Sequence, residues 1–207
     1  MNIVGEGSPV RVTAHLSSPI IGMDRVMLDG PVAWAWVMLA KAEGRIVPAI
    51  TAEYAPDFPL PFSQWMTEDT WGWCVSKGTE DCIGYTTVQI RRRPAVYAMA
   101  RFAPDRSHHA GLGPFKARDV ALPARIVPSI TWHCLVTDKL ELFRLLRSVT
   151  NISSRWRNGF GRVESWDVDE STLVDAWMDR PLPAVDGTRS VPVRPPYWHP
   201  SRMALCD

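Results

Sequence analysis

The chain has 207 residues, enough for one well-cored domain with at most one elaborate insertion. Its 46% hydrophobic and 22% charged residues are ordinary for a soluble globular protein, and its net charge of +1 excludes any argument for nucleic-acid binding from total charge alone. The longest apolar run, residues 32–40, is far below the ~20 residues that a bilayer requires, and residues 1–9 lack the apolar stretch of a signal peptide. We therefore expect a soluble, cytoplasmic protein with no membrane partner.

The cysteines predict neither a disulfide framework nor a metal site. They show no CxxC spacing: Cys74, Cys82, Cys134 and Cys206. His133 stands beside Cys134, but adjacent residues of a strand point to opposite faces, which makes a poor metal site. We expect four reduced thiols, no metal and no cofactor.

Charge is segregated along the chain. Residues 144–162 hold five arginines and no acid, and residues 91–125 hold eight basic residues against two acids. Seven acids and a single arginine lie in residues 164–186. A near-neutral protein with this distribution can still present a strongly basic face.

The N-terminal third shows one strand signal and one helix signal. Alternating apolar and polar residues predict a half-buried strand over residues 10–16. Asp29 as N-cap predicts a helix over residues 29–41. Because this helix is apolar on every side, we expect it to be buried, with Trp34 and Trp36 in the core.

The middle of the chain is less regular. Residues 51–70, rich in proline and aromatic side chains, predict an ordered irregular connection, and residues 71–76 and 84–93 predict strands. Residues 94–128 carry much glycine, proline and basic charge. We interpret them as an inserted basic arm, either a long hairpin or a loop.

The clearest helix signal lies in the C-terminal half, after a strand predicted over residues 126–137. Asp138 with Glu141 three residues on forms a capping box, and apolar residues follow at helical spacing: Leu142, Leu145, Leu146 and Val149. A glycine-containing basic loop comes next.

The remaining segments complete the predicted order. They are a strand over residues 160–168, a short helix over residues 170–178, and a tail over residues 180–207 whose six prolines predict an extended chain. The order fits a single α+β domain over residues 1–207, a ferredoxin-like (RRM-type) β-α-β-β-α-β fold with helices on one face, an elaborated central arm and a glycine-rich loop. The alternative is an unrelated α+β domain.

The loop over residues 150–163 is the most specific segment of the sequence. Gly159 and Gly161 flank Phe160, which lets the backbone approach a partner closely, and successive amides in such a loop can form an anion-binding nest. The alternative is a solvated loop that ends in a glycine turn.

Side chains in the same loop suit RNA. The guanidinium groups of Arg155, Arg157 and Arg162 are fork-shaped donors for phosphate oxygens. Trp156 and Phe160 offer stacking surface for unpaired bases, worth about 1–3 kcal/mol for each stacked base.

The sequence also resembles a known family. Residues 158–163, Asn-Gly-Phe-Gly-Arg-Val, after a helix that contains Glu-Leu-Phe-Arg-Leu-Leu, resemble the glycine-rich loop of the CRISPR-associated RAMP superfamily. Residues 10–34 resemble the start of the type IV effector subunit that caps the 5′ handle of the guide RNA, and residues 113–118 resemble the basic loop of that subunit. Ser153 departs from the pattern, because many members carry glycine there.

The resemblance implies a non-catalytic subunit of a type IV CRISPR effector. Its expected partners are the guide RNA (crRNA 5′ handle) and the backbone filament subunit, with the large subunit and target DNA as further candidates. Base pairing would read the target while the protein grips RNA backbone. The resemblance assigns RNA contacts to two groups, the arm and the glycine-rich loop: His109, Phe115, Lys116 and Arg118, and Arg155, Trp156, Arg157, Asn158, Gly159, Phe160, Gly161 and Arg162.

Two other functions stay open. His108 and His109, with Lys116 nearby, could supply the general base and the cation of metal-independent RNA cleavage, so an endoribonuclease that processes repeat RNA is one alternative. A stand-alone RNA-recognition domain is the other.

Overall fold

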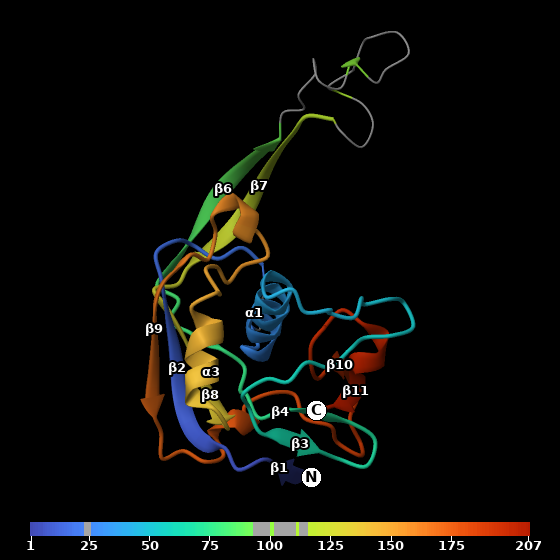
Figure 1. The fold of residues 1–207 in the computed structure, drawn as a ribbon. Helices are drawn as coiled ribbons and strands as arrows, with labels where there is room; N and C mark the ends of the chain where they lie inside the picture. Colours follow the sequence, from blue (N-terminus) through green and yellow to red (C-terminus); the bar gives the residue numbers. More distant parts are fainter. Residues whose placement is uncertain (23–25, 93–99, 102–110, 112–115) are drawn as a thin grey trace.

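A computed structural model describes residues 1–22, 26–92, 100–101, 111 and 116–207 (Figure 1). This part of the chain is a mixed α/β structure whose paired strands run antiparallel. Its centre is a four-stranded sheet in the order β5–β8–β2–β9, with bounds Thr79–Glu80, Ser129–Val136, Ser8–Leu16 and Val163–Glu170.

Strand β2 confirms the strand expected over residues 10–16. Its core-facing side chains are fully buried: Val10, Val12 and Ala14. Polar residues alternate with them on the opposite face: Arg11, Thr13 and His15. The alternation of apolar and polar residues in β2 therefore reflects a sheet with one face covered by the core and one face open to solvent.

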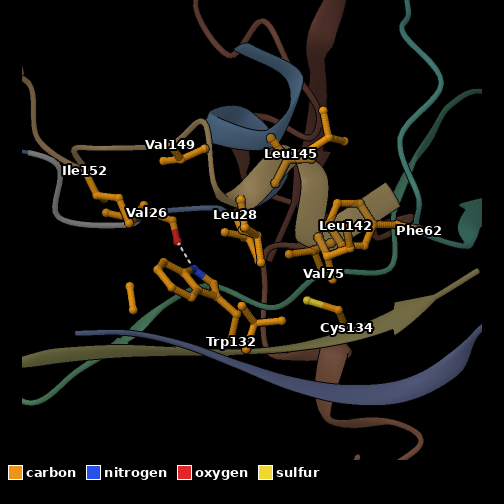
Figure 2. Packing of buried hydrophobic residues seen from close by; sticks show 14 of the residues in the cluster. Val26, Leu28, Phe62, Val75, Trp132, Cys134, Leu142, Leu145, Val149 and Ile152 are labelled. Atoms are coloured by element: carbon orange, nitrogen blue, oxygen red, sulfur yellow. Dashed lines mark hydrogen bonds between the residues drawn. The ribbon is translucent and has the colours of Figure 1, made fainter. Parts of the chain in front are cut away.

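Helices α1 (Asp29–Ala42) and α3 (Lys139–Leu146) cover the apolar face of this sheet and close the main core (Figure 1). Figure 2 shows this core from close by, with Trp132 and Cys134 of β8 facing the leucines of α3. The indole Nε1 of Trp132 donates to the carbonyl of Val26 at 2.8 Å, which satisfies the polar atom of a fully buried ring.

Helix α1 begins at Asp29, but Asp29 is not its N-cap. Leu28 occupies that position, with no side-chain cap hydrogen bond. Asp29 lies inside the first turn, fully buried, where its carboxylate accepts a hydrogen bond from the Tyr197 hydroxyl at 2.5 Å. The capping prediction was wrong because this acid contacts the C-terminal segment instead of the amides of its own helix.

Helix α1 is also not buried on every side. Trp34 is 43% exposed and Met38 is 46% exposed, while Trp36 is half-buried and stacks on Phe58 with ring centroids 4.9 Å apart. The prediction that Trp34 belongs to the core was wrong. Only one side of the helix faces the sheet, and an all-apolar sequence does not indicate which side.

Helix α3 confirms the predicted helix and the first half of its capping box. The Asp138 carboxylate accepts from the Glu141 amide at 2.9 Å. The Glu141 carboxylate accepts from the Arg144 guanidinium at 2.7 and 2.8 Å instead of returning to the N-cap. The apolar residues of the repeat are buried against the sheet: Leu142, Leu145 and Leu146.

Strands β6 (Gly84–Arg92) and β7 (Arg118–Ile126) pair along their whole length and form a ribbon that projects from the domain (Figure 1). Strand β7 is the described part of the arm expected over residues 94–128, together with a few isolated residues. Strand β7 ends at Ile126 and β8 begins at Ser129. The strand expected over residues 126–137 is therefore shorter at its start, because its first residue belongs to β7.

A second sheet lies beside the first. It contains β1 (Asn2–Val4), β3 (Gln64–Met66) and β4 (Trp71–Trp73) in the order β1–β3–β4. The connection expected to be irregular over residues 51–70 therefore includes one short strand, and β4 covers the first half of the strand expected over residues 71–76.

Strand β9 continues to Glu170, where the sequence predicted the start of a helix over residues 170–178. Pairing with β2 extends through Val10 and Glu170, and this pairing keeps the chain extended. Of the expected helix only the 3-10 turn η2 (Ala176–Met178) forms.

The segment 180–207 is more structured than the extended tail that its prolines predicted. Strand β10 (Arg189–Pro192) pairs with β11 (Met203–Cys206), and the 3-10 turn η3 (Pro200–Arg202) precedes β11. This layer closes a second apolar core: Trp65, Cys74, Leu135, Trp177, Val193 and Cys206.

Arg180 fastens this C-terminal layer to the rest of the domain. Its side chain is 1% exposed, and its guanidinium donates to the carbonyls of Trp73 (2.7 Å), Val75 (2.9 Å) and Val193 (2.5 Å). Asp29 Oδ2 lies 3.9 Å from Arg180 Nη1. Burial raises the pKa of Asp29 although Arg180 and the Tyr197 hydroxyl oppose that shift.

Candidate nucleic-acid interface

The glycine-rich loop joins the end of α3 to the start of β9 and is closed by its own backbone. Asn151 and Arg162 form an isolated antiparallel bridge. The Ile152 amide donates to the Gly161 carbonyl at 2.7 Å, and the Val163 amide donates to the Thr150 carbonyl at 2.9 Å. The loop therefore begins and ends at one fixed point at the edge of the sheet.

The two glycines of the loop have different surroundings. Gly161 has φ +62°, and a Cβ placed there would lie 1.9 Å from the Ile152 carbonyl oxygen. Gly159 has φ +86°, ends the 3-10 turn η1 (Trp156–Asn158), and would place a Cβ in open space. Gly161 thus permits close packing within the chain, whereas the Cα of Gly159 faces open space on the outside of the loop.

The segment that follows β2 holds the loop from one side. The Gly161 amide donates to the Pro19 carbonyl at 2.8 Å. The Ser18 hydroxyl donates to the Gly159 carbonyl at 2.9 Å and accepts from the Arg162 amide at 2.8 Å. These bonds join residues more than 140 positions apart in the sequence, so the loop is fixed by tertiary contacts.

Ser153 and its neighbour turn inward to the same segment. Ser153, which stands where many members of the resembled family have glycine, is buried. Its hydroxyl donates to the Ile21 carbonyl at 3.1 Å and accepts from the Ile21 amide at 3.2 Å. The Ser154 hydroxyl donates to the same carbonyl at 2.6 Å. The front of the loop is therefore part of the domain's own packing.

Most of the backbone amides expected to form an anion-binding nest are already engaged in hydrogen bonds. The amides of eight loop residues already donate within the chain: Ile152, Ser154, Arg155, Trp156, Asn158, Gly159, Gly161 and Arg162. An amide bonded to a carbonyl or hydroxyl oxygen cannot also cradle a phosphate without loss of that bond. Recognition at this loop thus depends mainly on its side chains.

Those side chains face solvent. Five of the side chains predicted to contact RNA are exposed, namely Arg155, Trp156, Arg157, Asn158 and Arg162, whereas Phe160 is half-buried and Gly161 is buried. Within the part of the chain that the structure describes, the three arginines form no ion pair, and the Arg157 guanidinium lies 5.1 Å from the centroid of the Trp156 ring. Among the described residues the loop thus presents three exposed cations without an acidic partner, and one of them, Arg157, lies beside the exposed indole of Trp156.

The predicted residues of the arm lie apart from the loop. Lys116 and Arg118 are exposed, with Arg118 at the end of β7 that lies opposite Arg92. The eight residue steps from Ile126 to Arg118 correspond to roughly 27 Å of ribbon at the usual rise of a strand. Phe115, His108 and His109 lie outside the described residues.

The base of the arm is fixed to the same segment that holds the loop. Ile20 and Arg125 exchange backbone hydrogen bonds of 2.9 Å. The Arg125 guanidinium also donates to both carboxylate oxygens of Glu80 at 2.8 and 2.9 Å, in a pair whose side chains are less than 20% exposed. The segment 17–22 therefore connects the loop and the arm at one end of the domain (Figure 1).

A pocket missed by sequence reasoning lies beside the loop. It has a volume of about 430 Å³ and is lined mainly by apolar groups from α1, the loop and the C-terminal layer. Trp34 and Trp156 both line it, with ring centroids 6.0 Å apart. The exposed Trp34 could not be found from the sequence, because the helix around it is uniformly apolar.

Other site classes find no support in the residues that the structure describes. No group of three or more His, Cys, Asp or Glu side chains in these ranges could hold a metal ion. No helix among them is long and apolar enough to span a membrane. His133 and Cys134 lie on opposite faces of β8, as their adjacency predicted, with Cys134 in the core.

Together the fold and the loop define a small α/β protein that presents a tightly held cationic loop beside an aromatic pocket. Residues 109–206, slightly under half of the chain, match a family described as CRISPR type IV associated protein Csf3. The matched stretch contains β7, the glycine-rich loop and the C-terminal layer. No curated protein matches the chain significantly. The family match supports an association of this chain with type IV CRISPR systems.

Proposed function

We propose that this chain is a non-catalytic subunit of a type IV CRISPR ribonucleoprotein effector, that it binds the 5′ handle of the guide RNA, and that it caps the backbone filament. The observation that carries the proposal is the exposed loop, in which Arg155, Arg157 and Arg162 form no ion pair with any described residue and Arg157 lies beside the exposed Trp156. Guanidinium groups without acidic partners are free to bind phosphate oxygens, and an exposed indole offers a stacking surface. The family match supports the CRISPR setting.

A ferredoxin-like fold of the RAMP superfamily is part of the same proposal. Taken in chain order, β2, α1, β5, β8, α3 and β9 give the order β-α-β-β-α-β, and the first strand lies between the third and the fourth. Both helices cover one face. This arrangement supports a ferredoxin-like unit, with the β6–β7 ribbon as an insertion between β5 and β8.

The open face of the sheet argues against a stand-alone RNA-recognition domain. Two contacts link β2 and β9 across this face: an ion pair of Arg11 with Asp169 at 2.9 Å, and a hydrogen bond between His15 Nε2 and the Asp167 carboxylate at 2.7 Å. The facing residues on β8 are Ser129, Thr131 and His133. RRM-type domains stack bases on aromatic rings of this face, whereas here carboxylates occupy it. We therefore place the RNA on the loop and not on the sheet.

The test is binding of repeat-derived handle RNA by the purified chain at several salt concentrations, measured by fluorescence anisotropy. Replacing Arg155, Arg157 and Arg162 together by Ala should weaken binding and reduce the slope of log K against log salt by about 2, since each lost single-strand phosphate contact contributes about 0.7. Equal affinity and slope in the triple variant would remove the loop from the RNA site.

A control variant separates the loop from general charge. Three exposed cations outside the loop carry the same total charge: Arg11, Lys139 and Arg189. Their replacement by Ala should leave the affinity much closer to that of the wild type. If both triple variants lose the same affinity, binding reflects net charge and the proposed site is wrong.

Two further experiments test the remaining parts of the proposal. Co-purification from cells that express the complete complex should recover guide RNA and a filament subunit with this chain, whereas a stand-alone RNA-binding domain would recover neither. Incubation of repeat RNA with the protein in the absence of metal should leave the RNA intact. A cut that His109→Ala abolishes would establish an endoribonuclease instead.

A further inference from the structure

The pocket beside the loop is assembled from three distant parts of the chain. Trp34 comes from α1, Trp156 from the glycine-rich loop, and Pro181 and Pro192 from the C-terminal layer. Its volume of about 430 Å³ lies within the range of small-ligand sites, about 300–1,000 Å³. It is therefore large enough for a planar aromatic ligand.

The two tryptophans of this pocket are both partly exposed. Trp34 is 43% exposed and Trp156 is 44% exposed, with their ring planes inclined by 59°. Indole rings gain most from burial, and exposed apolar surface that lines a concavity commonly marks a binding site. Both rings line the pocket, so each can offer surface to a flat group that enters it.

Charge indicates what kind of ligand fits. Trp156 lines the pocket and also lies under the Arg157 guanidinium, so a single ring belongs to both the pocket and the cationic loop. A ligand stacked on Trp156 would therefore lie close to the Arg157 guanidinium, which forms no ion pair with any described residue and can bind an anionic group of that ligand. A nucleotide has this chemistry, an apolar planar base joined to a phosphate, whereas a purely apolar side chain of a protein would leave the arginines unused.

Polar groups of the pocket are already engaged within the chain. The side-chain Nδ2 of Asn151 donates to the Phe160 carbonyl at 3.1 Å, and the Thr150 hydroxyl donates to Asn151 Oδ1 at 3.1 Å. The Tyr197 hydroxyl donates to Asp29. Few donors are left to read the edge of a base. The affinity for a base would therefore depend on its stacking area, and purines would bind more tightly than pyrimidines.

We propose that this pocket takes one unstacked nucleobase of the bound RNA, which stacks on Trp34 and Trp156 while its phosphate lies against the arginines of the loop. The inference rests on the proposed RNA-binding function and adds Trp34, which lies on α1 outside the loop, to the RNA site. It also makes the C-terminal layer a wall of that site.

The experiment is an abasic scan of handle RNA, in which each nucleotide in turn lacks its base, against wild-type protein and Trp34→Leu. We expect one position where the abasic substitution weakens binding by about 5- to 150-fold, the range for loss of one base–aromatic stack. Trp34→Leu should weaken intact RNA in the same range and should make that position insensitive. The exposed Trp198 lies outside the pocket, so Trp198→Leu should behave as wild type.

A second measurement does not depend on a variant. 2-Aminopurine placed at the sensitive position of the RNA should change its fluorescence on binding to wild-type protein, and a pyrimidine there should bind more weakly than a purine.

The outcomes separate this inference from the proposed function. If the triple arginine variant loses RNA but the abasic scan is flat, the pocket takes no base and the loop function stands. If the wild type binds no RNA, both fail. If Trp34→Leu binds RNA normally but no longer recovers a protein partner from the complex, the occupant is a protein and the inference is overturned.

Discussion

Gly161 offers the sharpest test of how the cationic loop is held. Replacing it by Ala adds one Cβ at φ +62°, a backbone conformation that costs an L-residue about 1–2 kcal/mol. The same Cβ would lie 1.9 Å from the Ile152 carbonyl oxygen and 2.5 Å from its carbon. The two backbone segments must therefore separate, and overpacking of this kind costs about 1–3 kcal/mol more.

Separation of these segments also weakens two hydrogen bonds. They are the bond from the Ile152 amide to the Gly161 carbonyl (2.7 Å) and the bond from the Gly161 amide to the Pro19 carbonyl (2.8 Å). Gly161→Ala should therefore lower the free energy of unfolding by about 2–5 kcal/mol. Gly159→Ala is the matched control, since its Cβ enters open space and only the backbone cost of about 1–2 kcal/mol remains.

The assay is urea unfolding followed by tryptophan fluorescence, with the unfolding free energy obtained by linear extrapolation. RNA binding should weaken in Gly161→Ala, because the loop moves, and should persist in Gly159→Ala. Equal losses of stability in the two variants, or a loss below about 1 kcal/mol for Gly161→Ala, would refute the view that close packing on Ile152 holds the loop.

Three further predictions test the core and its ionisable groups. Burial raises the pKa of the Cys74 thiol to about 12 and that of the Cys134 thiol well above its ordinary value. Cys82 is exposed, whereas the other three cysteines are buried. A thiol reagent should therefore label Cys82 alone in the folded chain and all four cysteines in denaturant, as measured by mass spectrometry. Burial raises the pKa of Asp29, so the folded chain holds a proton there at a pH where the unfolded chain has lost it. The stability that this proton provides is complete below the unfolded pKa of 3.8 and is lost as pH rises through the folded pKa. The unfolding free energy of Asp29→Asn, measured with urea across this range, should depend less on pH than that of the wild type. An identical pH dependence in the two proteins would contradict the raised pKa of Asp29. Asp138→Ala removes the side chain that caps α3 and should cost about 1 kcal/mol in the same assay, with no change in RNA affinity.

Local pattern was enough for the elements whose signal is complete within a few residues. Alternation over residues 10–16 located β2, because a strand with one covered face must alternate. Asp138 and the leucines after it located α3, because an N-cap and a repeat of 3.6 are properties of one helix alone. The same reasoning identified residues 150–163 as a basic loop between a helix and a strand, and its arginines are exposed as expected.

Local pattern failed where exposure depends on what packs against an element. Trp34 looked like a core residue because its helix is apolar throughout, and only the position of the sheet shows which side is left outside. Asp29 was predicted to be the N-cap of α1, but its carboxylate accepts a hydrogen bond from Tyr197, 168 positions away in the sequence.

The sequence alone determined the strand, the capped helix and the segregation of positive charge, since periodicity and composition act over short distances. Tertiary structure alone decided that eight amides of the loop donate hydrogen bonds within the chain, that Gly161 permits close packing within the chain, and that a pocket opens between Trp34 and Trp156. These features need residues 17–22, 29–42, 150–163 and 180–207 to meet. Which distant segments meet is a matter of close packing in three dimensions, and no local pattern records it.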